Sequence, residues 1–216
     1  MTENIRVLTH SSILIQSGDT VLYVDPFKVK GQPQDADFVF ITHDHFDHFS
    51  PEDIEKVSCE KTILVVPHKM HEKAVQETGD TLDDTRGIIP VKTNSPYDIN
   101  GFTFETVPAY NRAKPFHMKS AGWVGYIFCL DGKRIYVAGD TDATPEAREV
   151  RCDVALVPVG GIYTMNPSQA AELINTIRPA AAIPTHYGSV VGTVSDAENF
   201  QRKVDPAIQV EIKMEY

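Results

Sequence analysis

Cysteine is scarce in this sequence of 216 residues, which has only three cysteines, at widely separated positions, and no C-x-x-C pair. A disulfide framework is therefore not expected, and the reducing cytoplasm is the expected location. Long apolar runs are also missing, and the opening residues, MTENIRVLTH, lack the design of a signal peptide. We therefore expect neither a membrane-spanning segment nor a secreted protein.

Positive charge is in short supply as well, because 20 Lys and Arg stand against 30 Asp and Glu and the formal net charge is −10. A nucleic-acid partner, which is held through its phosphates, is therefore not expected. The sequence has no G-x-G-x-x-G, Walker or G-x-S-x-G motif, so neither a nucleotide cofactor nor a serine nucleophile has support. A small molecule is the expected partner, and the pattern leaves the oligomeric state open.

The predicted secondary structure alternates between strands and helices, and hydrophobic residues make up 42% of the chain, enough for one core. Residues 6–27 read as two extended runs, a hairpin is predicted to turn at Asp131-Gly132, and a helix to begin at Asn166-Pro167. Hairpins mixed with strand–helix alternation favour mixed sheets that are covered by helices on their outer faces. We expect a single α/β domain over residues 1–216.

Histidine and aspartate are concentrated in THDHFDHFS, residues 42–50, just before a helix start predicted at Ser50. Imidazole and carboxylate groups are ligands that suit zinc, iron and manganese. So short a segment cannot place all of these groups on one ion. The pattern therefore favours two neighbouring ions over an ordinary polar loop, with His43 and His45 on one ion and Asp47 and His48 on the other.

Two further candidates stand at the ends of predicted apolar strands. Asp140 ends RIYVAGD, where Gly139 allows a tight turn, and a carboxylate there could bridge two ions. His186 ends AAIPTH. Taken alone, Asp140 could be an ordinary turn aspartate and His186 a capping or core histidine. Together with the cluster in residues 42–50, both are better explained as metal ligands.

This motif set resembles the metallo-β-lactamase-fold hydrolases. The resemblance rests on HDHFDH at residues 43–48, GDTD with Asp140, PTHYG with His186 and VDP with Asp25, and it spans nearly the whole chain. It implies a four-layer αββα sandwich of two mixed β-sheets with helices outside. The THSSILI opening, the GWVGY strand and the PTHYG ending look most like the small cytoplasmic branch that includes ascorbate-6-phosphate lactonase and related proteins of unknown substrate.

The resemblance also implies a dinuclear site with a bridging carboxylate and an outer group that orients the histidine loop. His43 and His45 would bind the first ion, and Asp47, His48 and His186 the second. Asp140 would bridge the two ions, and Asp25 would orient the histidine loop from outside the ligand set. Zinc is the expected metal, with two ions, and manganese or iron are the alternatives. Asp47 and His48 are the expected catalytic residues, and Asp47 would also help to pass a proton.

One position departs from the family pattern. The family supplies a further histidine after the strand that corresponds to FTFETVPA, but this chain has Tyr110 and Asn111 there, and the next histidine is His117. Three alternatives follow: His117 is the ligand, Asn111 substitutes through its amide oxygen, or the first metal site is incomplete. Imidazole binds these ions better than a neutral amide, which favours His117.

Basic residues surround His117 in this otherwise acidic chain, and they could form an anion-binding lip or an ordinary solvated loop. Arg112 and Lys119 in this loop, together with Tyr163, are the candidate substrate-binding residues. His10 is expected to have a hydrogen-bonded structural role, and His68 is expected to face solvent.

The sequence therefore predicts a metal-dependent hydrolase that uses activated water on a small anionic ester, lactone or phosphodiester. The alternatives are a non-hydrolytic metal protein with a redox or sensing role, and a nucleic-acid-processing enzyme of the same fold.

Overall fold

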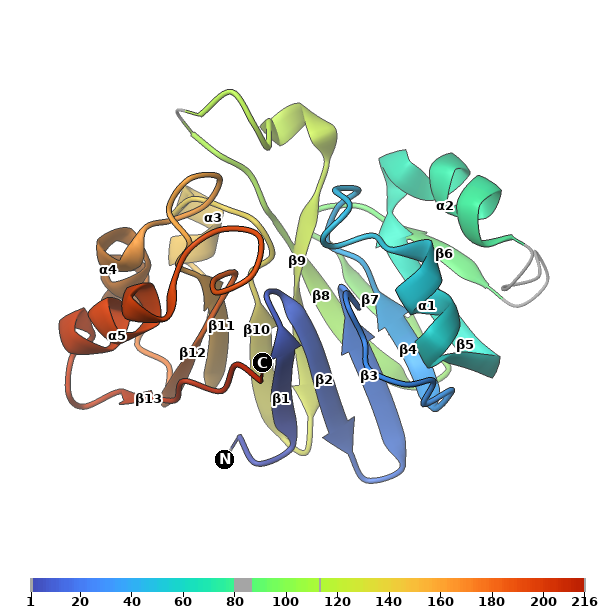
Figure 1. Cartoon of the computed structure of the whole chain (residues 1–216), viewed down its shortest axis with the longest axis horizontal. Coiled ribbons are helices and arrows are strands. Elements are labelled where there is room, and N and C mark those ends of the chain that lie inside the picture. Colours follow the sequence, from blue (N-terminus) through green and yellow to red (C-terminus); the bar gives the residue numbers. More distant parts are fainter. Residues whose placement is uncertain (1, 80–86, 113, 216) are drawn as a thin grey trace.

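The computed structural model describes residues 2–79, 87–112 and 114–215, and two β-sheets packed face to face form its centre (Figure 1). The first sheet has six strands in the order in which they follow along the chain. Their bounds are β1 Ile5–Thr9, β2 Ser12–Ser17, β3 Thr20–Val24, β4 Ala36–Phe40, β5 Ser58–Pro67 and β6 Ile88–Val91. Strands β1 to β3 pair antiparallel, and β3 to β6 pair parallel. This sheet is therefore mixed.

The second sheet has seven strands and is also mixed. Their bounds are β7 Pro96–Ile99, β8 Phe102–Pro108, β9 Val124–Leu130, β10 Lys133–Val137, β11 Val154–Pro158, β12 Ala181–Thr185 and β13 Gln209–Val210. Strands β7 to β10 pair antiparallel and β10 to β13 pair parallel. Apolar side chains of both sheets meet between them, including Phe40, Phe104, Tyr126 and Phe128. The two mixed sheets confirm the predicted fold class.

Helices cover the outer faces of both sheets, which completes the four layers (Figure 1). Over the first sheet lie α1 Pro51–Val57, the 3-10 turn η1 His68–Met70 and α2 His71–Thr78; over the second lie α3 Pro145–Arg148, α4 Pro167–Ile177 and α5 Val194–Lys203. The 3-10 turn η2 Lys119–Ala121 precedes β9. No helix in the described part of the chain is long and apolar enough to cross a membrane.

The local signals place the main turns and caps as predicted. Ser50 caps α1, Asn166 caps α4 by accepting from the Gln169 amide, and β9 and β10 join through Asp131-Gly132. The expectation of two extended runs within residues 6–27 is wrong, because the segment forms three strands. The chain turns between β1 and β2 at His10, whose φ is 52°.

Candidate metal centre

The candidate residues meet in loops at one end of the two sheets. Asp25 follows β3, the 42–50 loop follows β4, Asp140 follows β10 and His186 follows β12. Parallel strands bring such carboxyl-end loops together, which is why these distant segments converge. Four site residues adopt the left-handed conformation that non-glycine residues rarely occupy: His10, Asp25, His117 and His186 have φ between 48° and 59°. Backbone strain of this kind is typical of functional sites.

One group of donors, the His117 cluster, consists of His43, His45 and His117. The His45 Nδ1 atom lies 3.1 Å from His43 Nε2 and 3.3 Å from His117 Nε2. Ligands of a tetrahedral zinc ion are separated by about 3.4 Å when the Zn–N bonds are 2.0–2.1 Å. The spacing of the three imidazoles therefore fits one ion. The ring of Trp123 lies against all three histidines and shields them on one side.

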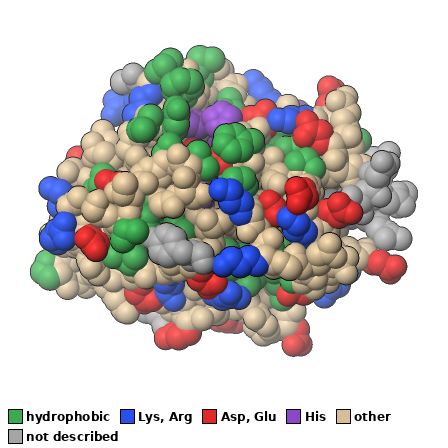
Figure 2. Space-filling view, viewed as in Figure 1, with side chains coloured by type: hydrophobic (Ala, Val, Ile, Leu, Met, Phe, Trp, Pro, Cys, Tyr) green, Lys and Arg blue, Asp and Glu red, His purple; other side chains and the backbone are tan. Residues whose placement is uncertain are grey.

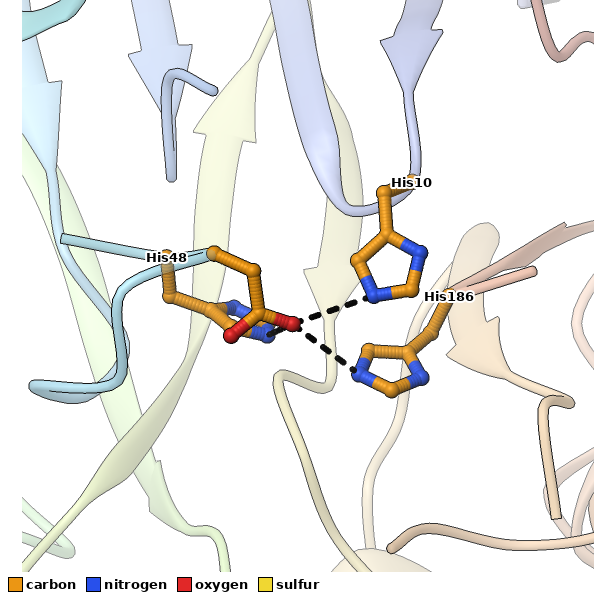
Figure 3. A group of neighbouring side chains, drawn as sticks. His10, His48 and His186 are labelled. Carbon is orange, nitrogen blue, oxygen red and sulfur yellow. Dashed lines mark ion pairs between the residues drawn. The ribbon is translucent and has the colours of Figure 1, made fainter. Parts of the chain in front are cut away.

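A second group of donors, the Asp47 cluster, consists of His10, Asp47, His48 and His186. The Asp47 Oδ2 atom lies 3.2 Å from His10 Nε2, 3.7 Å from His48 Nε2 and 3.9 Å from His186 Nε2. Figure 3 shows the three histidines reaching this carboxylate from three separate parts of the chain. These distances also bracket the separation expected around one ion.

Asp140 lies between the two clusters. Its Oδ2 atom is 3.4 Å from His117 Nε2 and 3.1 Å from His186 Nε2, so a single oxygen touches both clusters. Its Oδ1 atom is 3.4 Å from His48 Nε2. Both Asp140 Oδ1 and His48 Nε2 are buried and have no hydrogen-bond partner within residues 2–79, 87–112 and 114–215. Buried polar atoms without partners are costly, and a bound metal ion would satisfy them.

Asp25 holds the histidine loop from outside the clusters. Its carboxylate accepts hydrogen bonds from the Thr42 amide (2.7 Å), the Thr42 hydroxyl (2.6 Å) and His48 Nδ1 (2.7 Å). The last of these fixes a proton on His48 Nδ1 and turns Nε2 toward Asp47 and Asp140. Asp25 also lies close enough to His43 and His48 to share an ion. Its oxygens are already engaged in three hydrogen bonds, so the orienting position fits the geometry better.

The electrostatics of the clusters follow from burial and from the two central charges. Burial and the neighbouring histidines lower the pKa of His117 to about 4, although Asp140 opposes this shift. Burial also lowers the pKa of His48, but the Asp140 and Asp25 carboxylates outweigh it and raise that pKa to about 9. Burial raises the pKa of Asp140, but His186 and His48 outweigh it and lower it well below the usual range. Asp140 is therefore a carboxylate at neutral pH and His117 a neutral imidazole, which are the forms that bind metal ions, whereas His48 would release a proton when an ion binds.

The departure from the family pattern takes a definite form in the structure. The His117 ring reaches the other two histidines of its cluster, whereas Asn111 stands behind it. The Asn111 side-chain nitrogen lies 3.0 Å from His117 Nδ1 and donates to the Tyr163 carbonyl. The Asn111 backbone amide donates to the His117 carbonyl. Of the three alternatives, the geometry fits His117 as the third donor and Asn111 as its support.

A pocket of about 650 Å³ opens over the two clusters, and Tyr163 lies on its wall. The structure does not bring Arg112 or Lys119 to this wall. The Lys119 ammonium pairs with Glu146 at 2.6 Å, and Arg112 lines a different hollow beside Asp142. Glu146 and Asp142, which come later in the chain, therefore lie beside Lys119 and Arg112.

Sequence reasoning missed several residues around these clusters. His10, expected to be structural, belongs to the Asp47 cluster. The pocket mouth carries the exposed apolar side chains Phe46, Phe116 and Val190, which are 67%, 50% and 37% exposed, and Lys73 lies beside them. Figure 2 shows apolar side chains gathered around the visible histidines. Phe46 could have been identified from the sequence, because it is an apolar residue inside an otherwise polar loop.

We predict that Asp25→Asn weakens zinc binding by about 10–100-fold, the usual cost of removing a group that orients metal ligands. An asparagine amide cannot accept all three hydrogen bonds, so the His48 ring loses its fixed orientation. Competition with a chromophoric chelator measures the affinity. Asp19→Asn, in the exposed hairpin turn between β2 and β3, is the matched control. Equal zinc affinities in the two variants would show that Asp25 does not orient the site.

Comparison with known proteins places the chain in a family. A family model described as "Beta-lactamase superfamily domain" matches residues 4–186. The UPF0173 metal-dependent hydrolase of Thermococcus kodakarensis is 30% identical over 220 residues, which cover 96% of this chain and 95% of that protein. A UPF0173 metal-dependent hydrolase of Thermus thermophilus is 29% identical over 211 residues, covering 92% of this chain and 90% of that protein.

Solved structures agree. A protein of Parabacteroides distasonis named as a metal-dependent hydrolase is 29% identical and superimposes with a TM-score of 0.77 over 97% of this chain and 91% of its own. A metallo hydrolase of Ignicoccus hospitalis, 24% identical, shares the fold with a TM-score of 0.77, covering 96% and 93%. This chain therefore belongs to the β-lactamase superfamily and is a metal-dependent hydrolase.

Proposed function

We propose that this chain hydrolyses a small ester, lactone or phosphodiester at a site holding two divalent metal ions, with residues 1–216 acting as one domain. The observation that carries the proposal is the pair of donor clusters with the Asp140 carboxylate between them. Zinc is the first choice because imidazole and carboxylate donors suit it, and manganese and iron accept the same donors.

Bound divalent ions would supply Lewis acidity, which lowers the pKa of water from about 15.7 toward neutrality. The chain's own residues would provide the charge that holds the ions and the group that transfers the proton. Asp140 is almost completely buried and keeps its negative charge centred between the clusters. Asp47 lies on the pocket wall, where its carboxylate can take a proton from the attacking water and pass it to the leaving group.

The pocket supports a narrower substrate class than the sequence did. Its mouth is apolar, through Phe46, Phe116 and Val190. At its edge the Lys73 ammonium lies 3.0 Å from the Asp44 carbonyl and 3.7 Å from the Asp44 carboxylate. We therefore propose a substrate with an apolar acyl or alcohol group packed against the phenylalanines. A negative charge on the substrate would compete with Asp44 for Lys73, whereas the sequence had pointed to Arg112 and Lys119.

The direct test is hydrolysis of p-nitrophenyl esters and of bis(p-nitrophenyl) phosphate by the zinc-loaded protein, before and after chelation. We expect turnover of at least one of these probes that is lost with the metal and restored by zinc. Two bound ions without turnover of either probe would favour the non-hydrolytic sensing role instead.

We predict that Phe46→Ala and Phe116→Ala each lower kcat/KM for p-nitrophenyl octanoate by about tenfold. The change for p-nitrophenyl acetate should be small, because the short ester does not reach the pocket mouth. A hydrophobic contact of this size is worth about 1–3 kcal/mol in specificity. Ile212→Ala removes an exposed apolar side chain elsewhere and is the control. Equal losses of kcat/KM for both esters would show that the pocket mouth does not contact the substrate.

A further inference from the structure

His10 occupies a position that hydrogen bonding does not explain. It is completely buried, its Nδ1 atom has no hydrogen-bond partner within the described residues, and its Nε2 atom has an ion-pair contact with Asp47 in place of a hydrogen bond. It also sits in the left-handed region, with a φ of 52°, in the two-residue turn between β1 and β2. A buried imidazole without well-formed hydrogen bonds, held in a strained turn, is costly unless the ring has a further partner.

That partner is suggested by the surroundings of the ring. His10 Nε2 lies 3.2 Å from Asp47 Oδ2, closer than either His48 Nε2 or His186 Nε2. Two ligands of one tetrahedral zinc ion are about 3.4 Å apart. The distance from His10 to Asp47 fits this value at least as well as the distances from His48 and His186, the two histidines that the family pattern includes.

The backbone fixes His10 beside His186. The His186 amide donates to the His10 carbonyl at 2.8 Å, and the two ring centroids are 4.0 Å apart. The turn of the first sheet and the end of β12 in the second sheet therefore present their imidazoles together (Figure 3). This main-chain hydrogen bond keeps the backbones of the two histidines together.

We propose that His10 is a direct metal ligand in the Asp47 cluster, an inference that rests on the proposed two-metal site. The Asp47 cluster offers four protein donors of its own and the His117 cluster three. With Asp140, which both share, the counts are five and four. An ion with more protein donors is held more tightly. The two sites are therefore unequal: the Asp47 cluster would fill first, and the His117 cluster, with fewer protein donors, would be the one where water is activated.

A purely positioning role differs from this proposal in a measurable way. If His10 only donated a hydrogen bond to Asp47, the ion in that cluster would contact the imidazoles of His48 and His186 alone. Nuclear magnetic resonance of ¹⁵N-histidine-labelled protein that carries one equivalent of cadmium-113 counts the coordinated imidazoles, because each bonded nitrogen couples to the cadmium nucleus.

We expect three coupled imidazoles in the wild type, two in His10→Gln and three in His117→Gln. Two in the wild type would make His10 a positioning residue. Three in His10→Gln with two in His117→Gln would mean that the His117 cluster fills first, which also overturns the proposal. If His10→Gln does not fold, the wild type and His117→Gln still decide, since three in both requires His10, His48 and His186 to be the ligands. The count needs no turnover, so a failed hydrolysis test would overturn the proposed function without touching this result.

Discussion

Asp140→Asn is expected to lower kcat for ester hydrolysis by about a thousandfold. The asparagine keeps the size of the side chain but removes the negative charge that lies between the His117 and Asp47 clusters. Loss of a charge that holds two ions costs several kcal/mol of transition-state stabilisation, and about 4 kcal/mol corresponds to a thousandfold change in rate. Steady-state kinetics on a p-nitrophenyl ester measures the effect.

Asp142→Asn is the matched control, because Asp142 lies two residues away but pairs with Lys114 at 2.6 Å outside both clusters. It should keep the wild-type rate within about threefold. Metal analysis of Asp140→Asn should show fewer bound ions than in the wild type. If Asp140→Asn bound two ions and kept the wild-type rate, Asp140 would not act as the bridge.

Removal of the metal is expected to lower the unfolding temperature by about 10–20 °C. Without ions, the two clusters and Asp140 bring six histidines and two carboxylates together. Buried atoms such as His48 Nε2 and Asp140 Oδ1, which have no hydrogen bond within residues 2–79, 87–112 and 114–215, would then lack the ion that satisfies them. Each ion present at about 100 times its Kd stabilises the fold by about 2.7 kcal/mol. For a chain of this size, 1 kcal/mol shifts the unfolding temperature by about 2–4 °C.

Differential scanning calorimetry of chelated and zinc-loaded protein measures this shift. Magnesium is the control ion, because it prefers oxygen ligands and should restore little of the lost stability. Equal unfolding temperatures with and without zinc would show that the clusters hold no ion tightly in the native state.

The parts of the fold that could be predicted are those determined by local chemistry. Ser50, Asn166 and the Asp131-Gly132 turn act within a few residues, so their spacing in the sequence is enough to identify them. The same is true of the 42–50 loop, where four candidate ligands lie within six residues. Strand ends carrying Asp140 and His186 could be tied to this loop because parallel strands present their carboxyl ends together.

The residues that could not be assigned depend on contacts between distant segments. His10 and His186 are brought together by two different sheets, and no periodicity along the chain records that contact. The choice between Asn111 and His117 depends on a loop that folds back so that the Asn111 amide meets the His117 carbonyl. Lys119 was a candidate substrate-binding residue in the sequence, but it pairs with Glu146 of α3, a helix that was not predicted.

The metal content per chain of the wild type, His117→Ala and Asn111→Ala tests the two-metal site most directly. Elemental analysis after zinc loading should find two ions in the wild type and in Asn111→Ala, and one in His117→Ala. This result would establish both ions and identify His117 as the third donor of its cluster. One ion or none in all three proteins would contradict the dinuclear site, and with it the proposed division of work between the two clusters.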